Sequence, residues 1–219
     1  CLCIIMTKLN QNERNKKMKK QFSRRIVVSA AIGALCLTIV SPVFASAATS
    51  SANTQVNATL NSVISITTNT TVALNVTPTP GGAASSSSDT VTVATNNATG
   101  YNLSLADTDS NTNLVSGANS IAAHTGTFAA PTTLGNNSWG YRVDNAGGFG
   151  AGPTASQSSV ANLSGTWAGV AQSGAAQTLK TTSANSNSDT TTVNYGVKVD
   201  TTKPSGTYSD QVTYTAVTN

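Results

Sequence analysis

Apolar and polar residues alternate with a period of two along most of the chain after residue 47. Such alternation is typical of strands that have one buried face and one face in solvent. Thr, Ser and Asn fill most of the polar positions, and no helical periodicity follows residue 47. The alternating runs are Val56–Ile66, Val72–Val76, Val91–Val93, Tyr101–Leu105, Trp139–Val143, Val193–Val199 and Tyr208–Ala216. The pattern predicts an all-β fold.

The segments between these runs have the composition of turns. Gly, Pro and Asn are concentrated at Pro78–Gly82, Asn96–Gly100 and Lys203–Gly206. Short strands at this spacing predict an antiparallel β-sandwich with Greek-key or immunoglobulin-like connections, and a barrel is the alternative. We expect residues 48–219 to form this one domain, with a Gly-rich insertion near 144–176. Ser85–Ser88 and residues 146–152 are predicted to be flexible loops.

Residues 18–47 have the three regions of a secretory signal peptide. A basic start at Lys19 and Lys20 precedes an apolar run of 15 residues, Ile26–Val40. Ala45 and Ala47 then place small side chains where a signal peptidase cleaves. We therefore expect a signal-peptide helix, cleavage after Ala47 and a secreted, extracellular product that contacts a membrane only before cleavage. A transmembrane anchor is the alternative, but the run is shorter than the roughly 20 residues that a spanning helix needs.

The residues before Met18 do not resemble a mature N-terminus. The chain opens with Cys1, and either Met6 or Met18 is a plausible start, so we expect residues 1–17 to be an upstream extension. Arg24 and Arg25 also allow export by the twin-arginine route, although the general secretory route is favoured. All three cysteines precede residue 48, so the mature domain is expected to be free of cysteine.

The distribution of charge argues against a nucleic-acid partner. The net charge is +4, but eight of the 12 basic residues precede residue 26. After Ala47 the sequence contains four basic and seven acidic side chains, so the predicted domain is mildly acidic. Nucleic-acid binding requires a basic surface, which this domain is not expected to have.

A stretch of about 20 residues near the C-terminus resembles part of a known group of proteins. Val197–Asp200, followed by Gly206-Thr207-Tyr208-Ser209-Asp210-Gln211-Val212, resembles the closing hairpin of secreted bacterial surface β-sandwiches of the fimbrial-subunit and spore-coat-U type. The resemblance implies a surface subunit with a sandwich fold. The composition is also similar to that of WxL wall-binding domains, but Trp139-Gly140-Tyr141 and Trp167-Ala168-Gly169 lack the Leu of that motif.

Residues suited to catalysis are scarce after Ala47. This part of the sequence contains no Glu, no Cys and a single histidine, His124. A serine hydrolase would need that histidine beside an activated serine, and no Gly-x-Ser-x-Gly elbow is present. We expect His124 to be a surface residue and the protein not to be an enzyme.

Two groups of residues are candidates for ligand binding. Asp107, Asp109, Asn111 and Asn113 offer oxygen atoms at every second position, as a calcium loop does, although a plain polar turn has the same composition. No other cofactor is expected. The aromatic residues Trp139, Tyr141 and Trp167 would suit a sugar-stacking platform, although the alternation around Trp139 favours the core.

These observations favour a secreted, non-enzymatic structural or adhesive protein of the cell surface, such as an adhesin, a pilus-like subunit or a coat component. Its partner is expected to be a surface glycan, another protein or a second copy of itself. In one version Thr54–Thr67 completes a neighbour's sheet, whereas pairing within its own sandwich is the simpler expectation. The alternative function is an extracellular carbohydrate-binding module, aided by calcium.

Overall fold

The computed structural model describes residues 48–219. The chain divides into two compact units, Cys1–Val56 and Asn57–Asn219. In the first unit, the described residues 48–56 are exposed and form neither helix nor strand. The expected signal peptide, with Ala45 and Ala47, lies outside the described residues. Residues 48–219 contain no helix that is long and apolar enough to cross a membrane.

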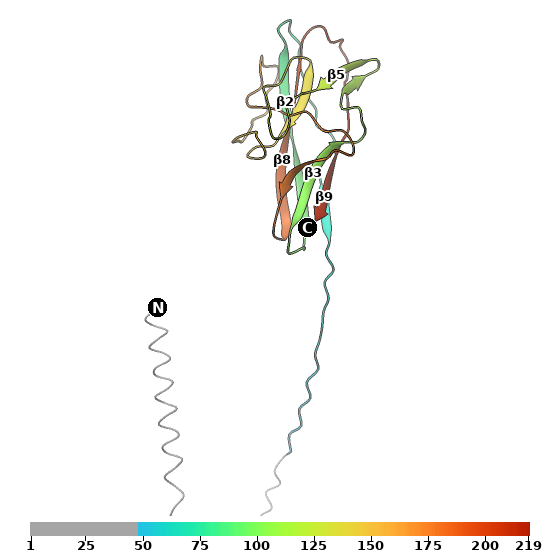
Figure 1. Cartoon of the computed structure of the whole chain (residues 1–219), viewed down its shortest axis with the longest axis vertical. Coiled ribbons are helices and arrows are strands. Elements are labelled where there is room, and N and C mark those ends of the chain that lie inside the picture. The colour runs from blue at the N-terminus through green and yellow to red at the C-terminus, as the bar shows by residue number, and fades with distance from the viewer. Residues whose placement is uncertain (1–47) are drawn as a thin grey trace, which may run out of the picture. The chain divides into compact units, whose positions relative to one another are not determined.

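The second unit holds two β-sheets and confirms the predicted all-β class (Figure 1). Six strands form the first sheet in the order β1-β2-β8-β6-β5-β4, and three form the second in the order β7-β3-β9. All pairings are antiparallel except that of β5 with β6. The strands are β1 Ile64–Thr67, β2 Ala83–Thr95, β3 Tyr101–Asp107, β4 Leu114–Ser116, β5 Asn119–Ala123, β6 Ser138–Arg142, β7 Gln177–Thr181, β8 Ser186–Val199 and β9 Val212–Thr218.

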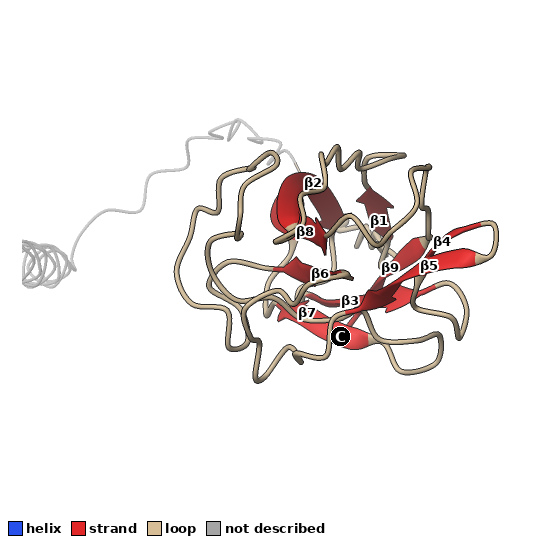
Figure 2. Cartoon of the chain, turned by 90° about the horizontal axis from the view of Figure 1, so that it is seen from above, coloured by secondary structure: helices blue, strands red, loops and turns tan. Residues whose placement is uncertain are grey.

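The core lies between the two sheets, as expected for a sandwich. Seen from above, β2 and β8 lie in one layer and β3 and β7 in the other (Figure 2). Their inward side chains are fully or almost fully buried and form one hydrophobic cluster, which includes Val91, Leu103, Leu179 and Val193. Val91, Leu103 and Val193 belong to the alternating runs of the sequence, so period-two patterning identified their buried face correctly. Leu179 lies in β7, which the sequence analysis did not predict.

Ser85–Ser88 is part of β2, so the prediction of a flexible loop there is wrong. The four serines pair with β8 from Val197 to Asn194, and Ser85 is buried. The Ser85 hydroxyl donates to the Asn75 carbonyl at 2.6 Å and accepts from the Ser159 N–H at 2.8 Å. Small polar residues fit here because the segment from 157 to 160 covers this part of β2 closely, as the Ala84–Val160 bridge shows.

The closing segment is not a hairpin, contrary to the expectation from the sequence. β8 belongs to the six-stranded sheet and β9 to the three-stranded one, so the turn at Lys203–Gly206 crosses between layers. The turn between β2 and β3 crosses in the same way at Gly100, which has a φ of 81°. A Cβ atom at Gly100 would lie 2.5 Å from the Thr182 carbonyl oxygen, so glycine is required there.

The long N-terminal strand is much shorter than expected. Only Ile64–Thr67 pairs with β2, and residues 48–63 are all exposed and belong to no strand. Val72, Leu74 and Val76 are half-buried against the core but belong to no assigned strand. The predicted pairing of Thr54–Thr67 within its own sandwich is therefore confirmed for its last four residues alone.

Candidate functional site

The three aromatic side chains proposed for sugar stacking lie in the core. Trp139, Tyr141 and Trp167 are 3%, 1% and 0% exposed. Trp139 stacks on Tyr195 with ring centroids 6.4 Å apart. Its indole N–H donates to the Thr112 carbonyl at 2.9 Å. Because a sugar needs an open ring face to stack on, these residues form no platform in this conformation.

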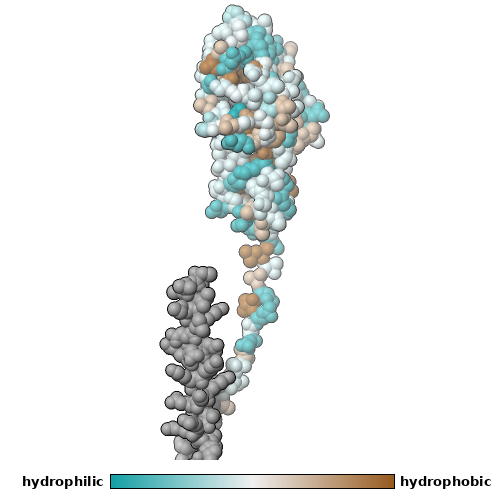
Figure 3. Space-filling model, turned by 60° about the vertical axis from the view of Figure 1, so that its left-hand side comes forward, coloured by the Kyte–Doolittle hydropathy of each residue, from teal (hydrophilic) through white to brown (hydrophobic). Residues whose placement is uncertain are grey.

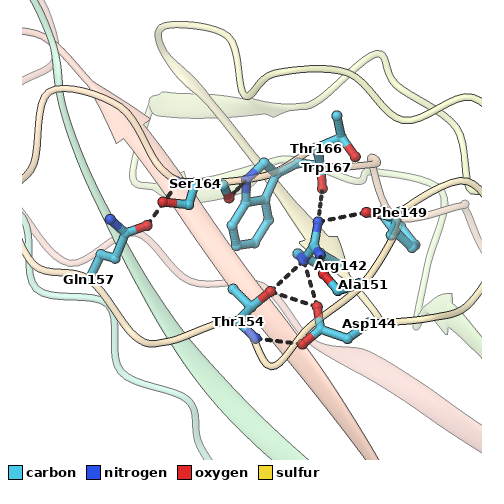
Figure 4. Close-up of polar contacts among 9 residues, drawn as sticks. All are labelled: Arg142, Asp144, Phe149, Ala151, Thr154, Gln157, Ser164, Thr166 and Trp167. Carbon is cyan, nitrogen blue, oxygen red and sulfur yellow. Dashed lines mark hydrogen bonds and ion pairs between the residues drawn. The ribbon is translucent and has the colours of Figure 1, made fainter.

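Arg142 binds the Gly-rich insertion to the sheet (Figure 4). It ends β6 and is almost completely buried. Its Nε donates to Asp144 at 2.6 Å and to the Thr154 hydroxyl at 2.5 Å. Its other nitrogens donate to the carbonyls of Phe149, Ala151 and Thr166. Arg142 was not identified from the sequence, where it appears only as a charged residue at the end of an apolar run.

Asp144 supplies the counter-charge for Arg142. Burial alone would raise the pKa of this carboxyl, but hydrogen bonds from Thr154 and Arg142 outweigh burial and lower the pKa. Asp144 Oδ2 also accepts from the Thr154 N–H at 2.6 Å. Every charged atom of the cluster is therefore partnered, which makes it a structural anchor of the insertion.

His124 is buried, so the prediction of a surface histidine is wrong. Its Nε2 lies 2.9 Å from the Thr132 hydroxyl oxygen, and the Gly135 N–H donates to Nδ1 at 3.5 Å. Burial lowers the pKa of the imidazole, and the contact with Thr132 opposes this shift. Gly126, Gly140 and Gly169 lie close around the ring or its backbone, which explains the small-residue surroundings in the sequence.

Successive residues of the proposed calcium loop are joined by hydrogen bonds within their own turn. Asp107 Oδ1 accepts the Asp109 N–H at 3.0 Å, and Asp109 Oδ1 accepts the Asn111 N–H at 2.6 Å. No hydrogen bond or ion pair joins the side chains of Asn111 and Asn113 to the two aspartates in the described structure. Within residues 48–219, no three His, Cys, Asp or Glu side chains are arranged as a metal-binding set. Asp107 instead faces Asp210, a residue that the sequence did not single out.

A shallow cleft of about 800 Å³ lies between β7, β8 and the insertion. Threonines from both strands line it, together with Phe128, Asp144 and Lys180. Its two charged side chains are already paired, Asp144 with Arg142 and Lys180 with Asp189. The cleft thus offers hydroxyl groups and one aromatic side chain, but no unpaired charge.

The most exposed apolar side chains of the described chain are found before β1. Val56, Leu60 and Val63 are 88%, 82% and 62% exposed. Figure 3 shows hydrophobic side chains standing out along the narrow segment that leads into the domain. Val56 and Leu60 share one phase of the alternation, so they would lie on the same face of an extended strand. An extended segment of this kind can pair with the edge of another sheet.

A partly covered edge lies nearby in the same fold. β9 is the last strand of the three-stranded sheet, and within residues 48–219 it pairs only with β3. Val212, Tyr214 and Ala216 point toward the core but remain half-buried. β1 approaches β9, and Tyr214 interacts with Asp89, which binds Thr68 just after β1. We call this side of the sandwich, bounded by residues 68–76 and β9, the open flank.

Comparisons with known proteins were made by family model, by curated sequence and by solved structure, and none of them gives a match to this chain.

Proposed function

We propose that the chain is a secreted, non-enzymatic structural or adhesive protein of the cell surface, and that it works by associating with further copies of itself. The observation that carries the proposal is the exposed apolar alternation before β1, in a molecule whose β9 edge is unpaired. In this proposal residues 54–63 of one copy extend β1 and add to the open flank of another.

The energetics favour burial of this segment. Val56 and Leu60 expose most of their surface, and burying a Leu or Val side chain contributes about 1.5–3 kcal/mol. Main-chain hydrogen bonds to an edge strand would add to this contribution. Half-buried side chains on the open flank, such as Val212 and Tyr214, would lose their remaining exposure in the same contact.

A pair of neighbouring substitutions tests the proposal. Leu60→Asp places a charge on the apolar face of the segment, and Thr59→Asp places the same charge on the other face. In light scattering on the full chain, we expect the wild type and Thr59→Asp to gain mass with concentration. Leu60→Asp should remain monomeric with an unchanged circular dichroism spectrum, because a buried carboxylate opposes association.

Two outcomes would contradict the proposal. One is a wild-type chain that stays monomeric at every concentration, and the other is assembly of Leu60→Asp to the same extent as Thr59→Asp. Unfolding of Leu60→Asp would instead show that residues 54–63 belong to their own sandwich, as the simpler expectation from the sequence had it.

A further inference from the structure

Three carboxylates share one face where β3 ends and β9 begins. The two strands pair antiparallel up to Asp107, and beyond it the Thr108 N–H donates to the Gln211 carbonyl at 3.0 Å. Continuing this register places Asp109 opposite Asp210. Because side chains alternate between the faces of a strand, Asp107, Asp109 and Asp210 project to the same side.

Two of these carboxylates have an oxygen atom with no partner. Asp107 is 2% exposed, and its Oδ2 has no hydrogen bond. Asp210 Oδ1 accepts from the Gln211 N–H at 2.8 Å, while its Oδ2 is buried and also without a partner. Burial and the neighbouring carboxylates of Asp107 and Asp109 together raise the pKa of Asp210 to about 6, although the hydrogen bond from the Gln211 N–H opposes this shift.

No basic side chain of residues 48–219 compensates this charge. Each of the four is bound elsewhere: Arg142 to Asp144, Lys180 to Asp189, Lys198 to Asn162 and Lys203 to the Ser120 carbonyl. A buried carboxylate without a counter-ion lowers the stability of the fold. Binding of a proton or a cation would remove this destabilisation.

We propose that the facing carboxylates of Asp107 and Asp210 bind one divalent cation, Ca²⁺, with Asp109 beside it on the same face. Carboxylate oxygens are the donors that Ca²⁺ prefers, and water supplies much of its shell of roughly six to eight ligands. The Asp109 carboxylate accepts the Asn111 N–H instead of joining the other two. The site is therefore formed by the carboxylates of Asp107 and Asp210. The ion would fasten the start of β9 to the end of β3, independently of the assembly proposed above.

Calorimetric titration of the full chain with CaCl₂ tests this site. At about pH 7.5 we expect one ion per chain, with a Kd on the order of 10⁻⁴ to 10⁻³ M, as in extracellular calcium modules. Calcium at about ten times that Kd should raise the Tm by roughly 3–6 °C. Mg²⁺ should bind more weakly, because it demands a stricter geometry.

Asp210→Asn is the decisive variant, and Asp200→Asn is its control. The amide at 210 can donate to Asp107, so this variant should fold without calcium and lose the calcium-dependent rise in Tm. Asp200 lies outside the cluster, where it accepts hydrogen bonds from Asn136, Asn137 and Thr202. Its variant should keep the full rise, even if its starting Tm is lower. Absence of any calcium response in the wild type, or an unchanged response in Asp210→Asn, would overturn the proposal.

Discussion

The carboxyl of Asp210 makes stability depend on pH in an unusual direction. Its pKa of about 6 in the folded chain exceeds the ordinary value of about 3.9, because of burial and the nearby Asp107. Between these two values the folded state binds more protons than the unfolded state. Stability therefore falls as pH rises from about 4 to about 6 in calcium-free buffer, by on the order of 1–2 kcal/mol.

Denaturant unfolding at a series of pH values measures this dependence, and Asp210→Asn should abolish it. At more acidic pH the slope reverses, because Asp144 has a lowered pKa and loses its interaction with Arg142 on protonation. A wild-type stability that rises from pH 4 to pH 6 would show that the pKa of Asp210 is not raised in the folded chain.

Single residues were the hardest features to predict from the sequence. Asp210 and Asp109 are about 100 positions apart, and only the register of β3 with β9 brings them together. Arg142 and His124 are polar residues that the fold buries by enclosing them in loops rich in glycine. By contrast, the buried face of Trp139 and Tyr141 follows directly from their alternation with their neighbours.

At the scale of elements, Ser85 in β2 is hydrogen-bonded to two segments that belong to no strand, one at Asn75 and one at Ser159. Ser85→Ala removes the hydrogen bonds that its hydroxyl makes with the Asn75 carbonyl and the Ser159 N–H. We expect a loss of about 1–3 kcal/mol in the free energy of unfolding. Ser88→Ala, three residues along the same strand at an exposed position, should change it by less than about 0.5 kcal/mol. Equal effects in urea titrations would contradict this role of Ser85.

The longest strands were predictable, whereas β4, β5 and β7 lie outside the predicted runs and the pairing of the strands was not predictable. The runs at Tyr101–Leu105 and Val193–Val199 lie in β3 and β8 as predicted. The same alternation occurs whether consecutive strands pair in one sheet or face each other across the core. The turn at Lys203–Gly206 therefore resembled that of a hairpin, whereas it connects the two layers, as the turn at Gly100 also does.

At the scale of the whole molecule, the two-sheet sandwich follows from the length, spacing and alternation of the strands. The strand order does not, because β2 pairs with β8 and β3 with β9, across about 100 residues of sequence. The open flank also depends on this order, because the order places β9 at the edge of its sheet. The short β1, of four residues, adds to the exposure of this side.

The proposed assembly is directional, because one copy donates its N-terminal segment and the next accepts it at the open flank. A heterologous contact of this kind grows chains rather than closed pairs. Leu60→Asp keeps the accepting edge at β9 but lacks a competent donor segment. When mixed with wild-type protein it should join a chain and end growth there. The mean mass in light scattering should then fall steeply as its fraction increases, while Thr59→Asp should leave it unchanged. If the contact were instead a symmetric pairing of identical surfaces, the mixture would show no more than a dimer at any ratio.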